Sequence, residues 1–445
     1  MRIFYFSQPA TLASNFSPVD IVSIKDHTKT VKREGEMAAP LQLSFVNFAK
    51  DSYIIVEGKR NADRFFIIRS GKVRLSKEVQ IVAEESGDML GPGDFFGVVS
   101  TMSGHSHIET AQALSDVTLI SVQKDQFSQL IQGNAPVAMK IIMQFSKRMR
   151  FLDEALTRLT LKNNAMEDPS HIYEVAEYYA KHNQFNQAFY AYQKYIKCCP
   201  GGANVQTSVE RLKKIAPYVK NLQQTFKPEE MVRNYVKDSI IFCEGEPGDE
   251  LFIIQKGSVK IIKITDNNEI LLAVLKAGDI FGEMALLESK PRAAGAVAYE
   301  DCQLMAVNRD NFQQMIKAQP QLIARLTTLL AERIWLIYRQ LANTRINDPL
   351  GRMYDMLQIQ IDKKKVDVNA VVNYAFDFGL KELINMVGLS QGDGAIVGQK
   401  LMGNRTFQIM NDKLFVKDIK EIAKQISYYR KMQQLEKTRL GNKPQ

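Results

Sequence analysis

A carboxylate, a guanidinium and several small residues lie close together in the stretch from Phe281 to Val297. Glu283 stands near its start, and Arg292 precedes Ala293 and Ala294. An arginine guanidinium offers a phosphate a planar fork of donors, and a carboxylate accepts hydrogen bonds from sugar hydroxyl groups. The first turn of a helix beginning at Glu283 would add backbone N–H groups without intrahelical partners. This combination favours a ligand that carries both a sugar and a phosphate.

The order Phe-Gly-Glu-x-Ala-Leu, followed by Pro-Arg-Ala-Ala, resembles the phosphate-binding cassette of the cyclic-nucleotide-binding domain family. The resemblance implies that Glu283 binds the ribose 2'-hydroxyl and that Arg292 binds the cyclic phosphate. The alternative is a loop that keeps the shape of the cassette without binding a nucleotide. The resemblance places the ligand contacts at Gly282, Glu283, Met284, Ala285, Arg292, Ala293 and Ala294.

The same resemblance bears on which nucleotide is bound. Relatives selective for cGMP carry a hydroxyl directly after the arginine, whereas this chain has Ala293. We therefore expect cAMP as the ligand, with cGMP the weaker candidate and no further cofactor. Gly295 stands where the family usually has Thr or Ser, which removes a hydrogen bond worth about 1 kcal/mol. This change is expected to lower the affinity without abolishing binding.

Short strands rich in β-branched and aromatic residues surround the cassette and recur earlier in the chain. Phe66-Ile-Ile-Arg-Ser-Gly-Lys-Val73 matches Phe252-Ile-Ile-Gln-Lys-Gly-Ser-Val259, and Gly93-Asp-Phe-Phe-Gly97 matches Gly278-Asp-Ile-Phe-Gly282. Many short strands separated by Gly-rich turns indicate a β-roll or jelly roll. A repeat of this length indicates a duplicated domain and not a solenoid unit.

The duplication provides an internal comparison for the cassette. Aligned without gaps on Gly97, the first copy has Val98 at the ribose position, His107 at the phosphate position and Glu109 in place of a small residue. An imidazole is mostly neutral at pH 7, and the added carboxylate repels a phosphate. We interpret the first copy as a degenerate domain with a structural or regulatory role. His105 and His107 lack a third ligand, so a metal site is not favoured.

A long amphipathic helix is predicted after each β-roll, over about 136–162 and about 320–343, from apolar residues at helical spacing. In the family, the equivalent helix covers the base of the nucleotide and often takes part in dimers. The resemblance thus makes Trp335 and Tyr338 weaker candidates for contacts with the base.

Residues 172–200, between the two copies, have the spacing of a tetratricopeptide-type helical hairpin. Small side chains at Ala176 and Ala188 allow two helices to approach closely, and Pro200 is expected to end the second. One such repeat cannot bury its own apolar face. A helical linker packed on its neighbours is therefore favoured over a peptide-binding groove.

The C-terminal region resembles the winged helix-turn-helix of the Crp/Fnr regulators. Asp348 and Pro349 are expected to begin a helix, a turn at Gly388 separates two further helices, and residues 407–416 supply a hairpin. The helix after the turn, Gln391-Gly-Asp-Gly-Ala-Ile-Val-Gly-Gln-Lys400, has three glycines and no arginine. It therefore lacks the side chains that usually read bases. Because each interior glycine costs up to about 1 kcal/mol, the pattern also predicts a poor helix.

The C-terminal region carries more basic than acidic residues. Residues 343–445 carry 17 Lys or Arg against 11 Asp or Glu, a surplus of six (17 minus 11). Such a surplus supports contacts with phosphates but not the reading of sequence. DNA as a partner is therefore disfavoured, and a protein-docking role is favoured for the degenerate winged helix.

The whole chain has 445 residues and a net charge of +9 at pH 7. This length predicts several domains with cores of their own, and the mixed charges fit a solvated basic surface as well as an acidic partner. The four cysteines show no metal-binding spacing, so we expect them to be reduced and mostly buried in a cytoplasmic protein. No apolar run has the length of a membrane span, and no membrane contact is expected.

Residues 1–36 are polar and weakly patterned. Lys32-Arg-Glu-Gly-Glu36 must be encoded by mostly purine codons, as a translated ribosome-binding site upstream of Met37 would be. We hypothesise that this extension is non-native or disordered. Peptides from about residue 10 in the native protein would contradict the non-native origin.

Together these patterns predict an α+β fold with two tandem β-roll (jelly-roll) domains, each followed by a long helix, a helical linker between them and a C-terminal winged-helix-like domain. The expected segments are the extension at 1–36, the degenerate domain at 37–163, the linker at 164–219, the nucleotide-binding domain at 220–345 and the winged-helix-like domain with an amphipathic tail at 346–445.

No nucleophile–base pair, metal cluster or Gly-Lys-Ser/Thr loop is present in the sequence, so an enzyme is not expected. The expected function is a signal-transduction receptor with one cyclic nucleotide site in the second domain, regulating the C-terminal domain. The alternatives are a DNA-binding transcriptional regulator of the Crp/Fnr family and a non-binding scaffold or adaptor. Both a homodimer and a separate protein partner are compatible with the sequence.

Overall fold

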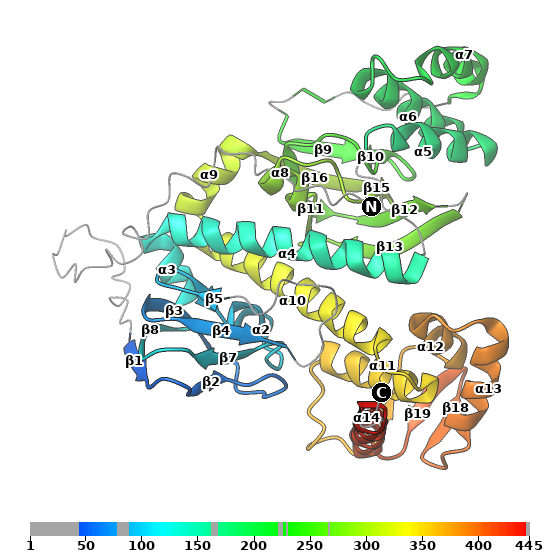
Figure 1. Cartoon of the computed structure of the whole chain (residues 1–445). Helices are drawn as coiled ribbons and strands as arrows, with labels where there is room; N and C mark the ends of the chain where they lie inside the picture. Colours follow the sequence, from blue (N-terminus) through cyan, green and yellow to red (C-terminus); the bar gives the residue numbers. More distant parts are fainter. Residues whose placement is uncertain are drawn as a thin grey trace. The chain divides into compact units, whose positions relative to one another are not determined.

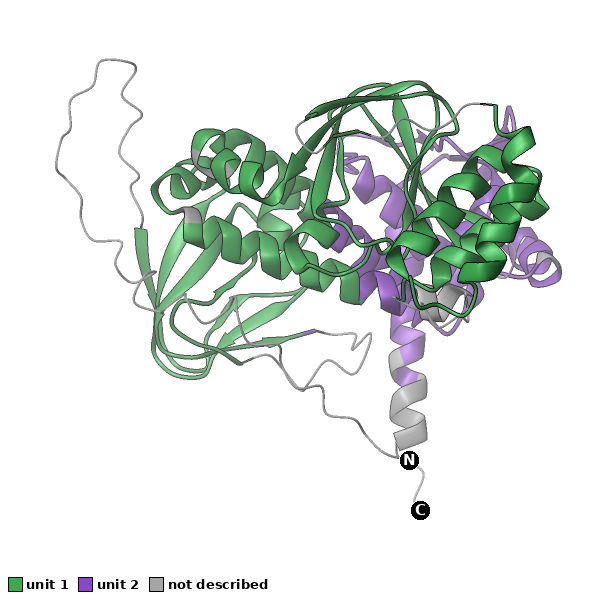
Figure 2. Ribbon diagram, turned by 90° about the horizontal axis from the view of Figure 1, so that it is seen from above, with its two compact units in different colours: residues 1–76, 88–151, 163–331 green, residues 77–87, 152–162, 332–445 purple. Residues whose placement is uncertain are grey.

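The computed structural model, shown in Figure 1, describes residues 44–77, 89–161, 168–220, 226–227, 230–265 and 268–441. The extension hypothesised at residues 1–36 lies outside these ranges. Figure 2 shows that the chain divides into two compact units. Unit 1 comprises residues 1–76, 88–151 and 163–331, and unit 2 comprises residues 77–87, 152–162 and 332–445.

The first β-roll consists of two antiparallel four-stranded sheets, with strand orders β1-β8-β3-β6 and β2-β7-β4-β5. The sheets are joined by tight turns, and Gly71 and Gly93 adopt φ values of 91° and 88°, which glycine reaches without steric cost. The strands are β1 (Ser44–Phe48), β2 (Tyr53–Ile55), β3 (Arg64–Ser70), β4 (Val73–Ser76), β5 (Met89–Leu90), β6 (Phe95–Phe96), β7 (Thr110–Ala113) and β8 (Val117–Gln123).

The second β-roll repeats this topology, with strand orders β9-β16-β11-β14 and β10-β15-β12-β13. The pairing register is also repeated, because Phe66 faces Ser121 in the first roll and Phe252 faces Ala306 in the second. The predicted duplication is therefore confirmed. The strands are β9 (Val232–Tyr235), β10 (Ile240–Phe242), β11 (Glu250–Lys256), β12 (Ser258–Thr265), β13 (Asn268–Lys276), β14 (Ile280–Phe281), β15 (Gly295–Ala298) and β16 (Cys302–Asn308).

Each β-roll encloses an apolar core supplied by alternating strand residues. Ile68, Val73 and Leu119 are buried in the first core, and Phe252 and Phe281 stack with ring centroids 5.3 Å apart in the second. The helices of the first copy are α2 (Val98–Ser103), α3 (Phe127–Gly133) and α4 (Ala135–Leu161), and those of the second are α8 (Glu283–Glu288), α9 (Arg309–Ala318) and α10 (Pro320–Thr344). Both predicted long helices are present as α4 and α10.

The linker contains the predicted helical hairpin, formed by α5 (His171–Lys181) and α6 (Phe185–Cys198) and followed by α7 (Val205–Ile215) and a 3-10 turn, η1 (Ala216–Tyr218). Ala176 and Ala188 are fully buried, which allows the close helix packing that their size predicted. The apolar face of the hairpin shares one core with Ile240, Ile262 and Val297 of the second β-roll. The hairpin is thus packed on its neighbour, as the favoured interpretation required.

The C-terminal region has the elements of a winged helix, all within unit 2. Asp348 caps α11 by accepting hydrogen bonds from the amides of Leu350 and Gly351, and the wing turns through Asn411 and Asp412, both at positive φ. The predicted cap and hairpin are confirmed. The elements are α11 (Pro349–Lys363), β17 (Tyr374–Ala375), α12 (Leu380–Val387), α13 (Gln391–Met402), β18 (Phe407–Met410), β19 (Lys413–Val416) and α14 (Lys420–Gly441).

The prediction of a poor helix after Ser390 was wrong, because residues 391–402 form the continuous helix α13. A Cβ atom on Gly394 would lie 2.3 Å from Ile384, and one on Gly398 would lie 3.1 Å from Leu380. These two glycines therefore let α13 pack closely on α12. The packing offsets the low helix propensity, an outcome that propensity alone cannot predict.

Candidate functional site

The predicted cassette begins where β14 ends. Gly282 has φ 78° and leads into α8, whose first residue is Glu283. A Cβ atom at Gly282 would lie 2.7 Å from an Arg292 nitrogen, so both the backbone conformation and the approach of the guanidinium require glycine. The Glu283 side chain is buried, with the residue 2% exposed. The guanidinium of Arg292 therefore lies against the backbone of Gly282, directly before Glu283, and this region is called the cradle of the second β-roll below.

Arg292 is buried against this cradle and is 6% exposed. Its Nη1 donates to the carbonyl oxygens of Gly282 at 2.7 Å and Glu250 at 2.8 Å, and its guanidinium carbon lies 4.1 Å from the ring centroid of Phe242. Burial lowers the pKa of Arg292, and the charge of Glu246 opposes this effect. The group keeps its charge because arginine titrates far above neutral pH.

One donor of this arginine is not satisfied by the described part of the chain. The buried Nε of Arg292 has no hydrogen-bond acceptor among the described residues. Buried donors in folded proteins almost always have an acceptor, so a ligand atom that accepts a hydrogen bond would satisfy this N–H.

The backbone of Arg292 is fixed by the loop after β10. Its N–H donates to the carbonyl of Glu246, and its own carbonyl accepts from the N–H of Gly245, both at 2.9 Å. The Glu246 carboxylate in turn accepts hydrogen bonds from Lys194 and from the Tyr190 hydroxyl of α6. The linker hairpin therefore holds the loop that positions the arginine.

The linker hairpin also contacts Glu244, which lies in the same loop after β10. Glu244 lies 3.3 Å from Lys263 Nζ and 3.7 Å from His171 Nε2, and His171 Nδ1 lies 2.8 Å from Glu174. Burial opposes protonation of His171, but the hydrogen bonds and charges of Glu244 and Glu174 outweigh it and raise the pKa of this histidine.

The remaining predicted site residues lie partly at the cassette and partly on α10. Ala285 is buried on α8, and Met284, Ala293 and Ala294 are half-buried around the cradle. Trp335 and Tyr338 are buried on α10 within unit 2, whereas the cassette belongs to unit 1. A contact of these two aromatic residues with a nucleotide stays a prediction.

The corresponding cradle of the first β-roll is filled by the chain itself. Val98 and His107 are both 2% exposed, and burial lowers the pKa of His107. The buried Glu109 carboxylate accepts a hydrogen bond from the N–H of Gly97 at 3.2 Å and pairs with Arg148 of α4 at 3.3 Å. The sequence predicted that Glu109 would repel a phosphate, and the structure shows that its carboxylate is bound by Gly97 and Arg148.

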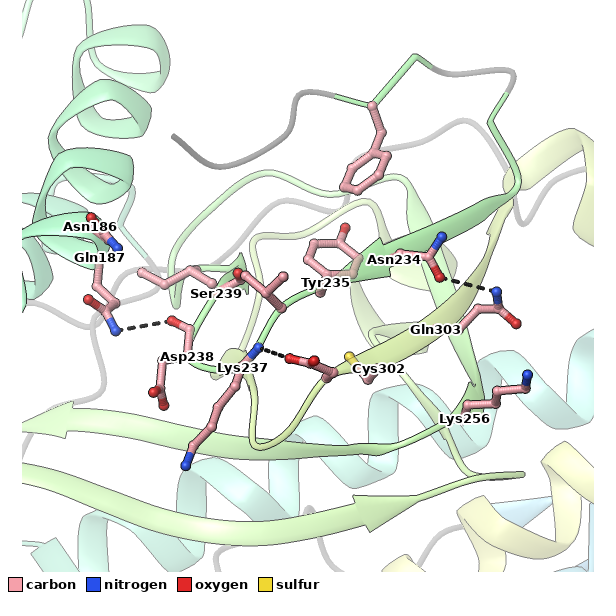
Figure 3. A pocket seen from close by; sticks show the side chains of 14 residues that line it. Asn186, Gln187, Asn234, Tyr235, Lys237, Asp238, Ser239, Lys256, Cys302 and Gln303 are labelled. Carbon is pink, nitrogen blue, oxygen red and sulfur yellow. Dashed lines mark hydrogen bonds between the residues drawn. The ribbon is translucent and has the colours of Figure 1, made fainter. Parts of the chain in front are cut away.

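The cavities beside the second β-roll include two of several hundred Å³. One of about 510 Å³ is bounded by α6 and by Arg292. Another of about 620 Å³, shown in Figure 3, is lined by neither Glu283 nor Arg292 and is separate from the cassette. In this second cavity Gln187 donates to the carbonyl of Asp238.

Sequence reasoning missed the charged contacts that support the cassette. Arg150 is 2% exposed although it is charged, and it lies beside the apolar residues of α4. A charged residue within the apolar stripe of an amphipathic helix was the available signal, because such a group is rarely buried without a partner. Glu244 and Glu246 gave no such signal, since their partners lie far away in the sequence.

Residues 45–134 and 232–319 match the family described as cyclic nucleotide-binding domain. The chain is therefore a protein with two tandem cyclic nucleotide-binding domains. Part of the chain is also similar to regulators that are described as CRP-like or as CRP.

The "CRP-like cAMP-activated global transcriptional regulator" of Mycobacterium tuberculosis is 29% identical over 159 residues, which span 36% of this chain and 71% of the relative. The "Cyclic AMP receptor protein" of Thermus thermophilus is 36% identical over 103 residues, spanning 23% of this chain and 48% of the relative. A co-crystal structure of the regulatory domain of Toxoplasma gondii PKA with cAMP matches with 19% identity and a TM-score of 0.20, covering 64% of this chain and 86% of that one. Among the residues that the structure describes, no helix has both the length and the apolar character needed to cross a bilayer.

Proposed function

We propose that the chain is a cAMP receptor with a single working site in the second β-roll, where Glu283 binds the ribose and Arg292 the cyclic phosphate. The observation that carries the proposal is the buried, positively charged Arg292 whose Nε has no acceptor among the described residues. A phosphate oxygen would satisfy this donor and neutralise the buried charge. Glu109 supplies the first β-roll with an anion of its own, which supports assigning the single site to the second β-roll.

The choice of cAMP over cGMP depends on Ala293, which offers no hydroxyl to the nucleotide. The matched regulator of Mycobacterium tuberculosis is described as cAMP-activated, which is consistent with this choice. Gly295 is buried and begins β15, so the missing hydroxyl is expected to reduce the affinity.

The test is calorimetric titration of the full chain with cAMP and cGMP. Binding of one cAMP per chain is expected, tighter than cGMP. Arg292→Ala should weaken it by about 2–5 kcal/mol, as for removal of one partner of a buried charge pair, and His107→Ala should have little effect. Equal effects of the two substitutions would refute the single site, and absence of binding would favour the scaffold alternative.

We further propose that α10 carries the signal to the winged-helix-like domain. Within unit 2, Asp355 of α11 is 2% exposed and accepts hydrogen bonds from Arg339 and Asn343 of α10, both at 3.1 Å. These buried contacts join the end of α10 to α11, so a shift of one helix would move the other. A nucleotide can drive such a shift only if it binds the two arrangements with different affinity.

The output is proposed to be protein docking, with DNA binding as the second candidate. The exposed side chains of α13 include Asp393, Ile396 and Lys400, and none is an arginine. Ile396 is 59% exposed, which suits an apolar contact better than a base edge. Salt-dependent retention on a DNA duplex column would instead support phosphate contacts.

A further inference from the structure

Helix α4 of the first domain contacts the cassette of the second domain directly, within unit 1. Arg150 Nε lies 2.9 Å from a carboxylate oxygen of Glu288, the last residue of α8, and Ser146 Oγ donates to the other oxygen at 2.7 Å. The side chains of Arg150 and Glu288 are 3% and 6% exposed. This ion pair is therefore shielded from solvent and joins residues far apart in the sequence.

The same arginine reaches the residue before the phosphate-binding arginine. Arg150 Nη1 donates to the carbonyl oxygen of Pro291 at 3.2 Å. One guanidinium thus holds both ends of the segment 288–291, which connects α8 to Arg292. Since the N–H of Arg292 is fixed by Glu246 on its other side, a displacement of Pro291 would disturb the position of the guanidinium.

The residues aligned with Arg150 and Glu288 in the other copies of helix and cassette cannot form an equivalent ion pair. The offset between the two copies of the cassette is 185 residues (282 minus 97), which places Trp335 opposite Arg150 and Ser103 opposite Glu288. Neither residue carries a charge. The ion pair therefore does not follow from the duplication but is specific to the contact of the first domain's helix with the second domain's cassette.

A neighbouring arginine on α4 contacts the other cradle. Arg148 pairs with Glu109 of the first β-roll at 3.3 Å, two residues before Arg150. Because the Glu109 carboxylate is part of the chain, the first cradle keeps its anion whether or not a nucleotide is present. Helix α4 is thus anchored to the first domain at Arg148 and to the second cassette at Arg150.

We propose that the first domain braces the nucleotide site of the second domain, with Arg150 as a positioning residue for Arg292. This inference rests on the proposed function, because it assigns the degenerate domain a role at that same site. The Glu109–Arg148 pair holds α4 in place, and α4 presents Arg150 to Glu288 and Pro291. The first domain thus supports the cassette of the second domain although it lacks the ligand-binding residues itself.

The first test is calorimetric titration of the full chain with cAMP. Arg150→Met and Glu288→Gln should each weaken binding at least fivefold, and the double variant should be no weaker than either single variant, because the pair acts as one unit. Arg150→Lys should recover part of the affinity. Lys147→Met, which removes an exposed charge from the same helix, should stay within twofold of the unmodified chain.

The second test needs no nucleotide and measures hydrogen exchange of the segment 288–294 in the ligand-free chain. Arg150→Met should accelerate exchange there while β11 stays protected, and Lys147→Met should leave it unchanged. Protection of β11 also shows that the variant is folded.

The outcomes separate this inference from the proposed function. Unaltered cAMP affinity in Arg150→Met, in a chain whose binding is lost in Arg292→Ala, would overturn the brace. If the full chain binds neither cAMP nor cGMP, the proposed function fails. Hydrogen exchange of residues 288–294 then tests whether Arg150 holds this segment. Unchanged exchange in Arg150→Met overturns the brace, and accelerated exchange supports it.

Discussion

The Glu109 carboxylate accepts a hydrogen bond from the N–H of Gly97 at 3.2 Å, inside the cradle of the first β-roll. In the second β-roll, the residues aligned with this pair are Ala294 and Gly282, so the position that corresponds to Glu109 carries no carboxylate. The two copies thus differ in the origin of the anion, which is internal in the first and proposed to be a ligand in the second.

Removal of the internal anion is expected to destabilise the first domain without creating a second site. Glu109→Ala leaves the Gly97 N–H and Arg148 without this partner, which should lower the free energy of unfolding by about 1–3 kcal/mol. Because Val98 provides no ribose acceptor, the stoichiometry should remain one nucleotide per chain. Denaturant unfolding and calorimetry measure the two effects, with exposed Asp125→Ala as the control. A second bound nucleotide would contradict this account.

The preference for cAMP is expected to depend on the residue after the arginine. Ala293→Thr adds a hydroxyl at the position where the resemblance places that of cGMP-selective relatives, and a hydrogen bond of this kind is worth about 1 kcal/mol. The ratio of the cGMP and cAMP dissociation constants should therefore shift toward cGMP by about fivefold. Competition titrations with both nucleotides test this, and an unchanged ratio would show that Ala293 does not select the base.

The contact of the linker hairpin with the second β-roll is expected to weaken as pH rises. The pKa of His171 is raised by Glu244 and Glu174, in spite of burial. Its contribution to stability is therefore complete below the unfolded value of about 6.5 and is lost as pH rises through the higher folded value. Comparison of unfolding at about pH 6 and pH 8 should show a drop that His171→Gln abolishes.

A matched substitution on the same hairpin controls for other titrating groups. His182 is exposed, so His182→Gln should preserve the pH dependence of the unmodified chain. Burial lowers the pKa of His107, so this histidine makes the free energy of unfolding rise with pH. The quantity to compare is therefore the difference in pH dependence between each variant and the unmodified chain. Equal pH profiles for His171→Gln and the unmodified chain would exclude the Glu244 contact as the source.

The glycines of α13 are expected to respond in opposite ways to alanine. Gly394→Ala places a Cβ atom 2.3 Å from Ile384 and should destabilise unit 2 by about 1–3 kcal/mol, the range for overpacking a core. Gly392 has no atom within 4 Å of an added Cβ, so Gly392→Ala should stabilise the helix by up to about 1 kcal/mol. Thermal unfolding of both variants provides the comparison, and destabilisation by both would argue against close packing as the role of Gly394.

Local patterns in the sequence were sufficient to predict the two β-rolls, the long helices and the cassette. Strand alternation and glycine turns depend on neighbouring residues, and the predicted ligand-binding motif lies within a single stretch from Gly282 to Ala294. The helicity of residues 391–402 could not be predicted in this way, because it depends on how closely Gly394 can approach Ile384 on another helix.

The sequence by itself determined which residues form the cassette, since Glu283 and Arg292 are positioned by one short segment of backbone. Only the tertiary structure decided what holds that segment. Arg150 and Glu246 reach it from α4 and from the loop after β10, and His171 of the linker hairpin contacts Glu244 of that loop. Such contacts join parts of the chain that are brought together only by folding, and nothing in the spacing of the residues along the sequence specifies them.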